Sequence, residues 1–211
     1  MTRALAALIV LVAYAVAAFG WRSLHQLRRH GDSGLRLARP ERGAPRVAHG
    51  LLVVALALAV ATPVAAVVAG DAAAPGGAGA LVTGGLGTAA VVAGSVLLAA
   101  GFALTLAAQV QMGASWRVGV DPEEATDLVT GGLYRWLRNP IYTAMLLALA
   151  GLVLLVPSAI ALAALVVGTV ALQLQVRVVE EPHLLRHHGA TYRRWAGEVG
   201  RFLPGVGRLR P

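Results

Sequence analysis

Residues 141–176 read IYTAMLLALAGLVLLVPSAIALAALVVGTVALQLQV, an apolar stretch without a single charged side chain. Pro157 and Ser158 divide this stretch into two segments, 141–156 and 158–176, with almost no loop between them. A helix needs about 20 apolar residues to cross a hydrocarbon core of about 30 Å. Because both segments approach that length, the stretch predicts a tight hairpin of two membrane-spanning helices.

Three further apolar segments precede the hairpin, at residues 4–19, 47–70 and 86–110. Gly94 and Gly101 lie seven residues apart on one face of the third segment, which favours close approach of a neighbouring helix. The whole chain has 211 residues, of which 57% are apolar and 13% are charged, whereas an ordinary soluble domain has about 25% charged residues. The sequence therefore predicts a single all-α integral membrane domain, 1–211, with five transmembrane helices and a cytoplasmic C-terminal helix.

The basic residues predict the orientation of these helices. All 18 of them are Arg, and the net charge is +8. Seven Arg lie in residues 22–46, three in residues 111–140 and seven in the tail from Arg177 onwards, so 17 of the 18 fall on one side of a five-span arrangement. The positive-inside rule assigns that side to the cytoplasm. The N-terminus is then outside and the C-terminus inside, in a bacterial-type inner or plasma membrane.

Two interpretations compete at the N-terminus. Arg3, the apolar run and the small residues before Gly20 resemble a signal peptide, which would send the next loop outside. The seven Arg of residues 22–46 favour a true span instead. In a soluble protein so many Arg would suggest nucleic acid, but beside membrane spans they indicate anionic lipid headgroups as the partner. We therefore expect no nucleic-acid partner.

Metal and thiol chemistry receive little support from the sequence. The chain has no Cys, which excludes disulfides, thiolate metal sites and a Cys nucleophile. His183 and His187 have the i, i+4 spacing of a metal pair, but no clear third ligand lies nearby. The same segment predicts an amphipathic surface helix, with Tyr192 and Trp195 on its apolar side. We therefore expect no metal.

A first polar segment, Arg138-Asn139-Pro140, stands where residues 141–156 begin. Pro140 suits the first turn of a helix, where its missing N–H is not needed, and Asn139 then occupies the N-cap position. One interpretation is a helix cap beside an Arg that extends to the headgroups. The other is an anion or cofactor site at the helix N-terminus, where free N–H groups attract negative charge. The residues alone favour neither interpretation.

A second polar segment closes the last predicted span. Gln173, Arg177 and Glu180 or Glu181 lie three or four residues apart, on one helical face. Pro182 predicts a break in the helix just after them. Charged residues at the end of a span next to a broken helix favour a polar pocket. The alternative is an intrahelical Arg177–Glu181 pair in the headgroup layer.

These two segments resemble a known family. LVTGGLYRWLRNPIY at residues 128–142 resembles the LVT-x-G-x-Y-x-x-x-R-H-P-x-Y block of the isoprenylcysteine carboxyl methyltransferase (ICMT) family. RVVEEPHLLRHHGATY at residues 177–192, followed by Phe202-Leu-Pro204, resembles its C-terminal block. The resemblance covers about half of the chain, within a methyltransferase core at 86–211, while residues 1–85 contribute two spans and their loops. The family's His before Pro is Asn139 here, which cannot act as a base.

The resemblance implies an S-adenosylmethionine-dependent methyltransferase that works without metal and releases S-adenosylhomocysteine. Its acceptor would be lipophilic, an isoprenoid or lipid-like molecule such as a small lipophilic carboxylate or a phospholipid amine, and its active site would face the cytoplasm. Arg138 would hold an anionic group and Glu180 would lie on the cofactor or substrate side, as the catalytic pair. The implied cofactor-binding residues are Gln111, Leu133, Tyr134, Arg138, Asn139, Pro140, Tyr142, Arg177, Glu180, Glu181 and Tyr192. The implied substrate-binding residues are Ser115, Trp116 and Arg117.

Two other functions remain open at this point. Arg193-Arg194 would suit the 2′-phosphate of NADPH in a membrane reductase of the sterol-reductase type. A non-catalytic membrane adaptor or small transporter is disfavoured, because no charged residue lies mid-span and no inverted repeat is apparent. The methyl acceptor and the oligomeric state do not follow from the sequence.

Overall fold

The computed structural model describes residues 2–34, 43–70, 85–118 and 126–209. Its α-helices are α1 (Arg3–Ala15), α2 (Arg22–His30), α3 (Ala44–Ala69), α4 (Gly85–Met112), α5 (Pro140–Leu155), α6 (Ala159–Leu174) and α7 (Glu181–Glu198). Two π-helical turns, η1 (Val16–Trp21) and η5 (Gln175–Glu180), and two 3-10 turns, η3 (Gly113–Ser115) and η4 (Gly132–Arg135), complete the elements. The predicted all-α class is confirmed for the described residues.

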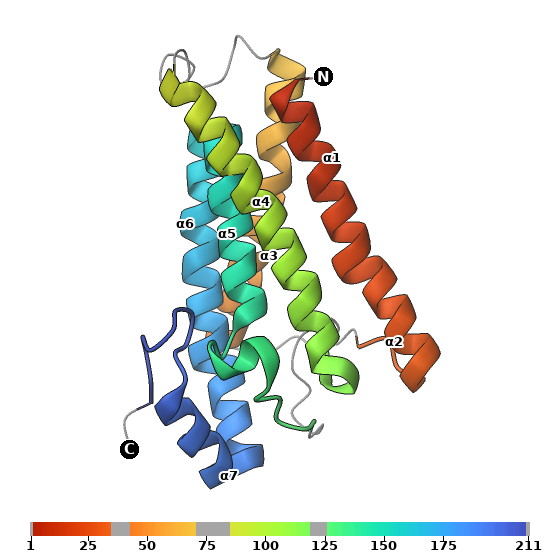
Figure 1. Cartoon of the computed structure of the whole chain (residues 1–211), viewed down its shortest axis with the longest axis vertical. Helices are drawn as coiled ribbons and strands as arrows, with labels where there is room; N and C mark the ends of the chain where they lie inside the picture. The colour runs from red at the N-terminus through yellow and green to blue at the C-terminus, as the bar shows by residue number, and fades with distance from the viewer. Residues whose placement is uncertain (1, 35–42, 71–84, 119–125, 210–211) are drawn as a thin grey trace.

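The long helices form one elongated bundle (Figure 1). In it α4 packs along α5, α3 packs along α6, and α1 lies against α3. The N-terminus and the start of α4 lie at one end, whereas the end of α4, the start of α5 and the C-terminus lie at the other. Within the described residues, four continuous helical stretches are long and apolar enough to cross a membrane: Arg3–His30, Ala44–Ala69, Gly87–Ser115 and Ala159–Glu198. α5, with 16 residues, is a shorter apolar helix.

Small residues bring α4 and α5 unusually close together. A Cβ added at Gly101 would lie 2.6 Å from the Ala144 carbonyl oxygen and 2.8 Å from the Ala148 nitrogen. A Cβ added at Gly151 would lie 2.6 Å from the Leu98 nitrogen. Because these neighbours are backbone atoms, only glycine permits the observed spacing. The close approach predicted from Gly94 and Gly101 is therefore confirmed.

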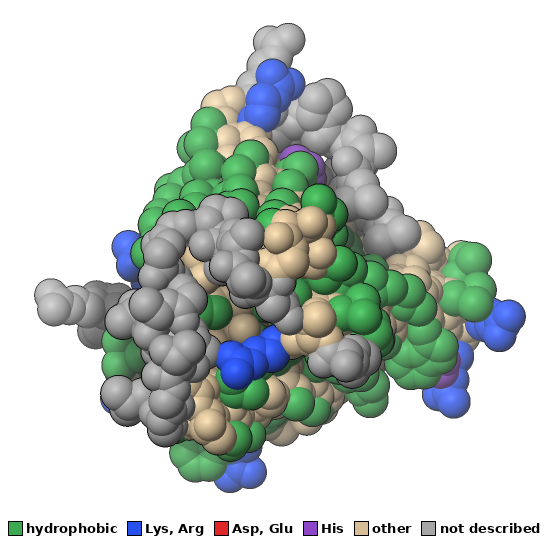
Figure 2. Space-filling view, turned by 90° about the horizontal axis from the view of Figure 1, so that it is seen from above, with side chains coloured by type: hydrophobic (Ala, Val, Ile, Leu, Met, Phe, Trp, Pro, Cys, Tyr) green, Lys and Arg blue, Asp and Glu red, His purple; other side chains and the backbone are tan. Residues whose placement is uncertain are grey.

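The outward faces of the bundle are apolar. Branched side chains that are about half exposed occur on successive helices, among them Val53, Val96 and Val166. Seen from the end that carries the N-terminus, hydrophobic side chains dominate the described surface, with Arg in only a few places (Figure 2). Such a surface suits lipid tails, since the apolar atoms need no partner there.

The first helix is longer than the sequence predicted. Residues 22–30, expected to begin a loop, continue the first helix as α2, so that Arg3–His30 is one helical stretch through the π-turn η1. The hydropathy pattern ended at residue 19 because Arg22, Ser23 and Gln26 are polar. In the fold these three side chains are buried, so their polarity does not mark the end of the helix.

The predicted break at Pro182 is wrong. The helix runs on from α6 through η5 into α7, and Pro182 lies at the start of α7. The Glu181 N–H bonds to the Val176 carbonyl, five residues earlier, so the hydrogen-bond ladder shifts just before the residue that lacks an N–H. The wider π-turn before Pro182 thus lets the helix continue past a residue that cannot donate a backbone hydrogen bond. The backbone instead leaves helical geometry at Gly189, with φ 49° and ψ −121°.

Candidate functional site

The turn that starts α5 is fastened to the C-terminal tail. The Arg138 N–H donates to the Gly200 carbonyl at 2.8 Å, and the Asn139 N–H donates to the Arg201 carbonyl at 3.2 Å. The Asn139 side-chain amide donates to the same Arg201 carbonyl at 3.1 Å. Asn139 therefore occupies the N-cap position without capping through its side chain, which corrects that expectation. Pro140 at the first helical position is confirmed.

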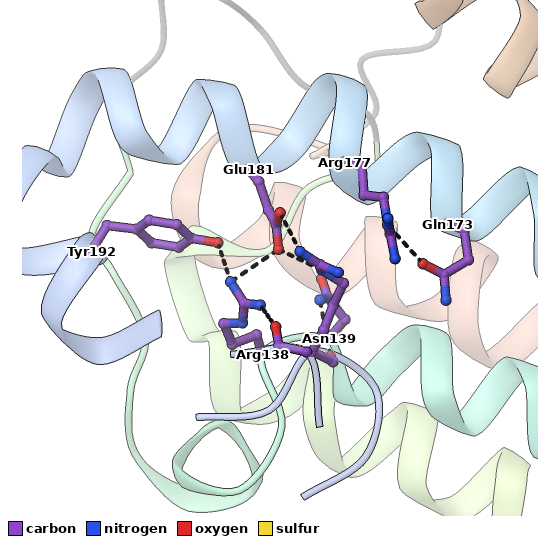
Figure 3. A network of polar contacts seen from close by, with 8 residues as sticks. Arg138, Asn139, Gln173, Arg177, Glu181 and Tyr192 are labelled. Carbon is purple, nitrogen blue, oxygen red and sulfur yellow. Dashed lines mark hydrogen bonds and ion pairs between the residues drawn. The ribbon is translucent and has the colours of Figure 1, made fainter. Parts of the chain in front are cut away.

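Arg138 and Glu181 form a buried ion pair. They are 5% and 6% exposed, and the Arg138 Nη1 atom lies 2.9 Å from Glu181 Oε1. Arg201 binds the same carboxylate through both oxygens, at 2.8 and 3.0 Å. Figure 3 shows the Arg138 guanidinium between the Glu181 carboxylate and the Tyr192 hydroxyl. One carboxylate thus joins the α5 turn, the start of α7 and the tail.

The remaining contacts of Arg138 also lead to these segments. Its Nη2 atom donates to the Gly207 carbonyl at 2.5 Å, and its Nη1 atom donates to the Tyr192 hydroxyl at 3.4 Å. Tyr192 itself is 1% exposed. Of the three guanidinium nitrogens of Arg138, only Nε has no hydrogen-bond partner among the described residues. A charge pair buried this well requires such extra partners, because desolvation of the two ions opposes their attraction.

Glu180, the neighbour of Glu181, has different surroundings. Its carboxylate accepts a hydrogen bond from the Tyr142 hydroxyl and one from the Gln175 amide at 3.4 Å. No Arg of the described ranges pairs with it, whereas Glu181 pairs with two. Glu180 therefore has no cationic partner among the described residues, and its removal from water raises the pKa of its carboxyl above the usual value.

Tyr134 lies near this carboxylate. Its side chain is buried, and its hydroxyl donates to the Ala108 carbonyl at 3.3 Å. Burial raises the pKa of the Tyr134 hydroxyl well above its usual range, and the nearby Glu180 carboxylate raises that pKa further. The phenol is therefore neutral at pH 7, and its ring remains an apolar face with a quadrupole.

Gln111 and Leu133 hold the turn that carries Tyr134. The Gln111 Oε1 atom accepts from the Leu133 N–H at 2.7 Å. Gly132 has a φ of 58°, and a Cβ there would overlap the Gln111 side chain. The contact thus joins the end of α4 to η4, and both residues predicted for cofactor binding have a positioning role in the structure.

Arg177 lies apart from the ion network. Its side chain is exposed, and its Nε atom donates to Gln173 Oε1 at 3.1 Å. Figure 3 shows this pair beside the Arg138 cluster rather than within it. The Arg177–Glu181 pair considered from the sequence is not formed, because Glu181 points to Arg138 and Arg201.

The three predicted substrate residues lie beside α2. Trp116 is 1% exposed, and the Arg22 guanidinium carbon lies 5.0 Å from its ring centroid. Arg117 pairs with Asp32 at 3.3 Å. Ser115 ends the 3-10 turn that follows α4. The predicted residues therefore fall into two groups, one around α5, η5 and α7 and one at the junction of α2 and α4.

The sequence did not indicate Arg201 or the Gly207 carbonyl as part of the network. Arg201 precedes Phe202-Leu-Pro204, so it adjoins a block that stood out, but nothing in its spacing points to Glu181, 20 residues earlier. The His pair is also reassigned: the His183 and His187 rings pack with centroids 4.1 Å apart. Within the described ranges no three His, Asp or Glu side chains are grouped to hold a metal ion.

Comparison with known proteins relates this chain to a family of methyltransferases by sequence and to a solved membrane enzyme by fold. Residues 89–191 match the family of phospholipid methyltransferases. The fold is similar to that of the eukaryotic intramembrane Ras methyltransferase ICMT (isoprenylcysteine carboxyl methyltransferase), with a TM-score of 0.60 and 16% sequence identity. The match covers 95% of this chain and 66% of that one, so this chain spans just under two thirds of its length. No curated protein matches in sequence.

Proposed function

We propose that this chain, an ICMT-like membrane methyltransferase, transfers a methyl group from S-adenosylmethionine to a lipophilic acceptor at the cytoplasmic membrane surface. When bound, this cofactor supplies a methyl group that its positively charged sulfonium already activates. The protein then needs alignment, exclusion of water and charge placement rather than a metal or a covalent nucleophile. The acceptor class we propose is an isoprenoid or lipid-like molecule, carboxylates included.

The environment of the Glu180 carboxylate is the main support for this proposal. A carboxylate that no Arg of the described residues neutralises, next to two tyrosines, suits a positively charged ligand group. Aromatic rings attract cations through their quadrupole, most strongly where water is excluded. The Tyr142 hydroxyl donates to the carboxylate, so it orients the negative charge while its ring stays beside it. We therefore propose that Glu180, Tyr134 and Tyr142 contact the cationic cofactor.

Arg138 and Glu181 receive a positioning role in this proposal. Their mutual pair, together with Arg201, holds the α5 turn against the start of α7. That arrangement keeps Tyr142, on the α5 turn, opposite Glu180, on η5. The hydrogen bond between Gln111 and Leu133 likewise holds the turn that carries Tyr134. We propose that Ser115, Trp116 and Arg117 contact the methyl acceptor, because they lie at the junction of α2 and α4, away from Glu180.

We further propose five crossings, with the N-terminus outside and the C-terminus in the cytoplasm of a bacterial-type inner membrane. The alternation of the helices between the two ends of the bundle supports an odd number of crossings (Figure 1). Arg186, Arg193 and Arg194 are exposed on α7, at the end of the bundle that contains the ion network. Such side chains suit the anionic headgroups of a cytoplasmic leaflet.

Calorimetry on the detergent-solubilised protein tests the cofactor. We expect S-adenosylmethionine and S-adenosylhomocysteine to bind, and Glu180→Gln to weaken the binding of the cationic cofactor by about 10- to 100-fold, because a charged contact is lost. Glu198→Gln, which removes an exposed carboxylate from the end of α7, is the matched control and should bind as the unaltered protein does. Binding of NADPH without either methyl compound would refute the proposal.

Cysteine labelling tests the orientation, since the natural chain has no Cys. Thr2→Cys, His30→Cys and Ala190→Cys each introduce one exposed thiol. In right-side-out vesicles we expect a membrane-impermeant maleimide to label residue 2 only, and in inverted vesicles residues 30 and 190 only. Labelling of residues 2 and 30 from the same side would contradict a spanning first helix.

A further inference from the structure

The C-terminal tail lies along the start of α5 and meets it through three consecutive carbonyl groups. Those of Gly200 and Arg201 accept backbone N–H groups from the turn just before α5, at 2.8 and 3.2 Å. The carbonyl of Phe202 accepts a side-chain hydrogen bond, from the hydroxyl of Thr143 at 2.9 Å. The tail backbone therefore follows the first turn of α5 residue by residue.

The hydroxyl of Thr143 makes a contact that its helix does not require. It lies 2.9 Å from the Phe202 carbonyl and 3.1 Å from the Asn139 carbonyl, four residues earlier in the chain. A threonine within a helix commonly makes only the second kind of bond. Thr169 on α6 is an example, because its hydroxyl donates to the Leu165 carbonyl at 2.7 Å. The bond from Thr143 to the tail is therefore an additional, long-range interaction.

Tyr142 stands between the two side chains that bind the tail. Asn139 precedes it by three residues and donates its side-chain amide to the Arg201 carbonyl at 3.1 Å. Thr143 follows it directly and binds the next carbonyl of the tail. The Tyr142 hydroxyl in turn donates to the Glu180 carboxylate. Because the tail contacts flank Tyr142 on both sides, a shift of this turn would move its hydroxyl relative to that carboxylate.

The same tail also fixes the other side of the Tyr142–Glu180 contact. Arg201, whose carbonyl binds the start of α5, places its guanidinium on the Glu181 carboxylate, at 2.8 and 3.0 Å from the two oxygens. Glu181 directly follows Glu180 in the chain. The tail is itself folded, since the Arg201 N–H donates to the Val206 carbonyl at 2.7 Å. A folded segment that binds both sides can set their relative position.

We propose that Thr143 and Asn139 are positioning residues, which hold the C-terminal tail against α5 and thereby align the Tyr142 hydroxyl with the Glu180 carboxylate. The inference rests on the proposed contact between these two groups and the cationic cofactor. Both positioning side chains act through Tyr142 rather than on the cofactor. Without them the first turn of α5 shifts, and the hydroxyl no longer orients the carboxylate. The attraction of that carboxylate for the sulfonium then weakens, because it depends on distance and alignment.

Two ligands that differ by one charge test this role. S-adenosylmethionine carries a sulfonium, whereas S-adenosylhomocysteine has a neutral thioether in its place. In calorimetry on the full chain in detergent, we expect Thr143→Val to bind the cationic ligand roughly 3- to 10-fold more weakly and the neutral ligand within about 2-fold of the native affinity. Thr143→Ser keeps the hydroxyl and should restore the native ratio. Thr169→Val, which removes only a bond within α6, is the matched control and should leave both affinities unchanged.

The outcomes separate this inference from the proposed function. If the native protein binds neither ligand, the cofactor assignment fails and the positioning role fails with it. If the native protein binds both, and Thr143→Val weakens them equally or changes neither, only the positioning role is overturned, because a general loosening of the fold does not distinguish a charge. The same loss in Thr169→Val also overturns it. If Thr143→Val does not fold, Asn139→Ala replaces it, since it removes the other side-chain bond to the tail, and a native ratio of the two affinities would then refute the role.

Discussion

Glu181→Ala is expected to lower the free energy of unfolding by about 3–5 kcal/mol, because the change leaves a buried cation without its counter-ion. Arg138 is 5% exposed, and Glu181 is the carboxylate that pairs with it, at 2.9 Å. The same change removes both hydrogen bonds of Arg201. The α5 turn and the C-terminal tail would then lose their common anchor.

Thermal and denaturant unfolding in detergent, followed by circular dichroism, measures this effect. Glu198→Ala, which truncates an exposed carboxylate on the same helix, should change stability by no more than about 0.5 kcal/mol. A double variant, Arg138→Met with Glu181→Met, should recover part of the loss, since removing both charges avoids an unpaired buried ion. A stability equal to that of the unaltered protein for Glu181→Ala would show that the network contributes nothing.

Gly101→Leu is expected to destabilise the bundle by about 3 kcal/mol or more, because added volume in a close-packed interface forces backbone shifts. A Cβ at residue 101 already lies 2.6 Å from the Ala144 carbonyl oxygen and 2.8 Å from the Ala148 nitrogen. Those atoms belong to the backbone of α5 and cannot rotate away. The two helices must therefore separate near the start of α5, the part of that helix that carries Tyr142.

The same unfolding measurements apply, with Gly50→Leu as the control. Gly50 lies on α3, and nothing comes within 4 Å of a Cβ added there. Because leucine favours helix over glycine by up to about 1 kcal/mol, this control should be neutral or slightly stabilising. Similar losses in both variants would mean that bulk on any helix, rather than the α4–α5 spacing, is responsible.

The helices themselves were predictable from local pattern. Apolar runs at 47–70, 86–110, 141–156 and 158–176 correspond closely to α3, α4, α5 and α6, because a helix that lies in lipid must be apolar around its whole circumference. Pro140 marked the start of α5 correctly, since proline fits the first helical turn. Two helix ends were predicted wrongly. At residue 22 the polar side chains are buried and the helix continues, and at Pro182 a π-turn keeps the helix intact.

For the candidate site, the sequence indicated several residues but not the contacts between them. Arg138, Glu180, Glu181 and Tyr142 stood out in the sequence because their side chains interrupt the apolar pattern where spans begin and end, and because motif resemblance drew attention to them. Which of them pair with each other did not follow. The Arg138–Glu181–Arg201 network and the hydrogen bond from Arg22 to the Gly113 carbonyl join residues separated by 20 to 91 positions, and no local periodicity encodes such partners.

The sequence by itself determined that this chain builds apolar helices, in which order they come and which connections are rich in Arg, because length, hydropathy and charge act locally along the chain. Only the tertiary structure decided that Glu181 is neutralised while Glu180 is not, and that Arg22 is enclosed while Arg29 is exposed. Neighbouring residues of one type differ in this way because burial and partners depend on which helix packs against each face, and that packing depends on the whole bundle at once.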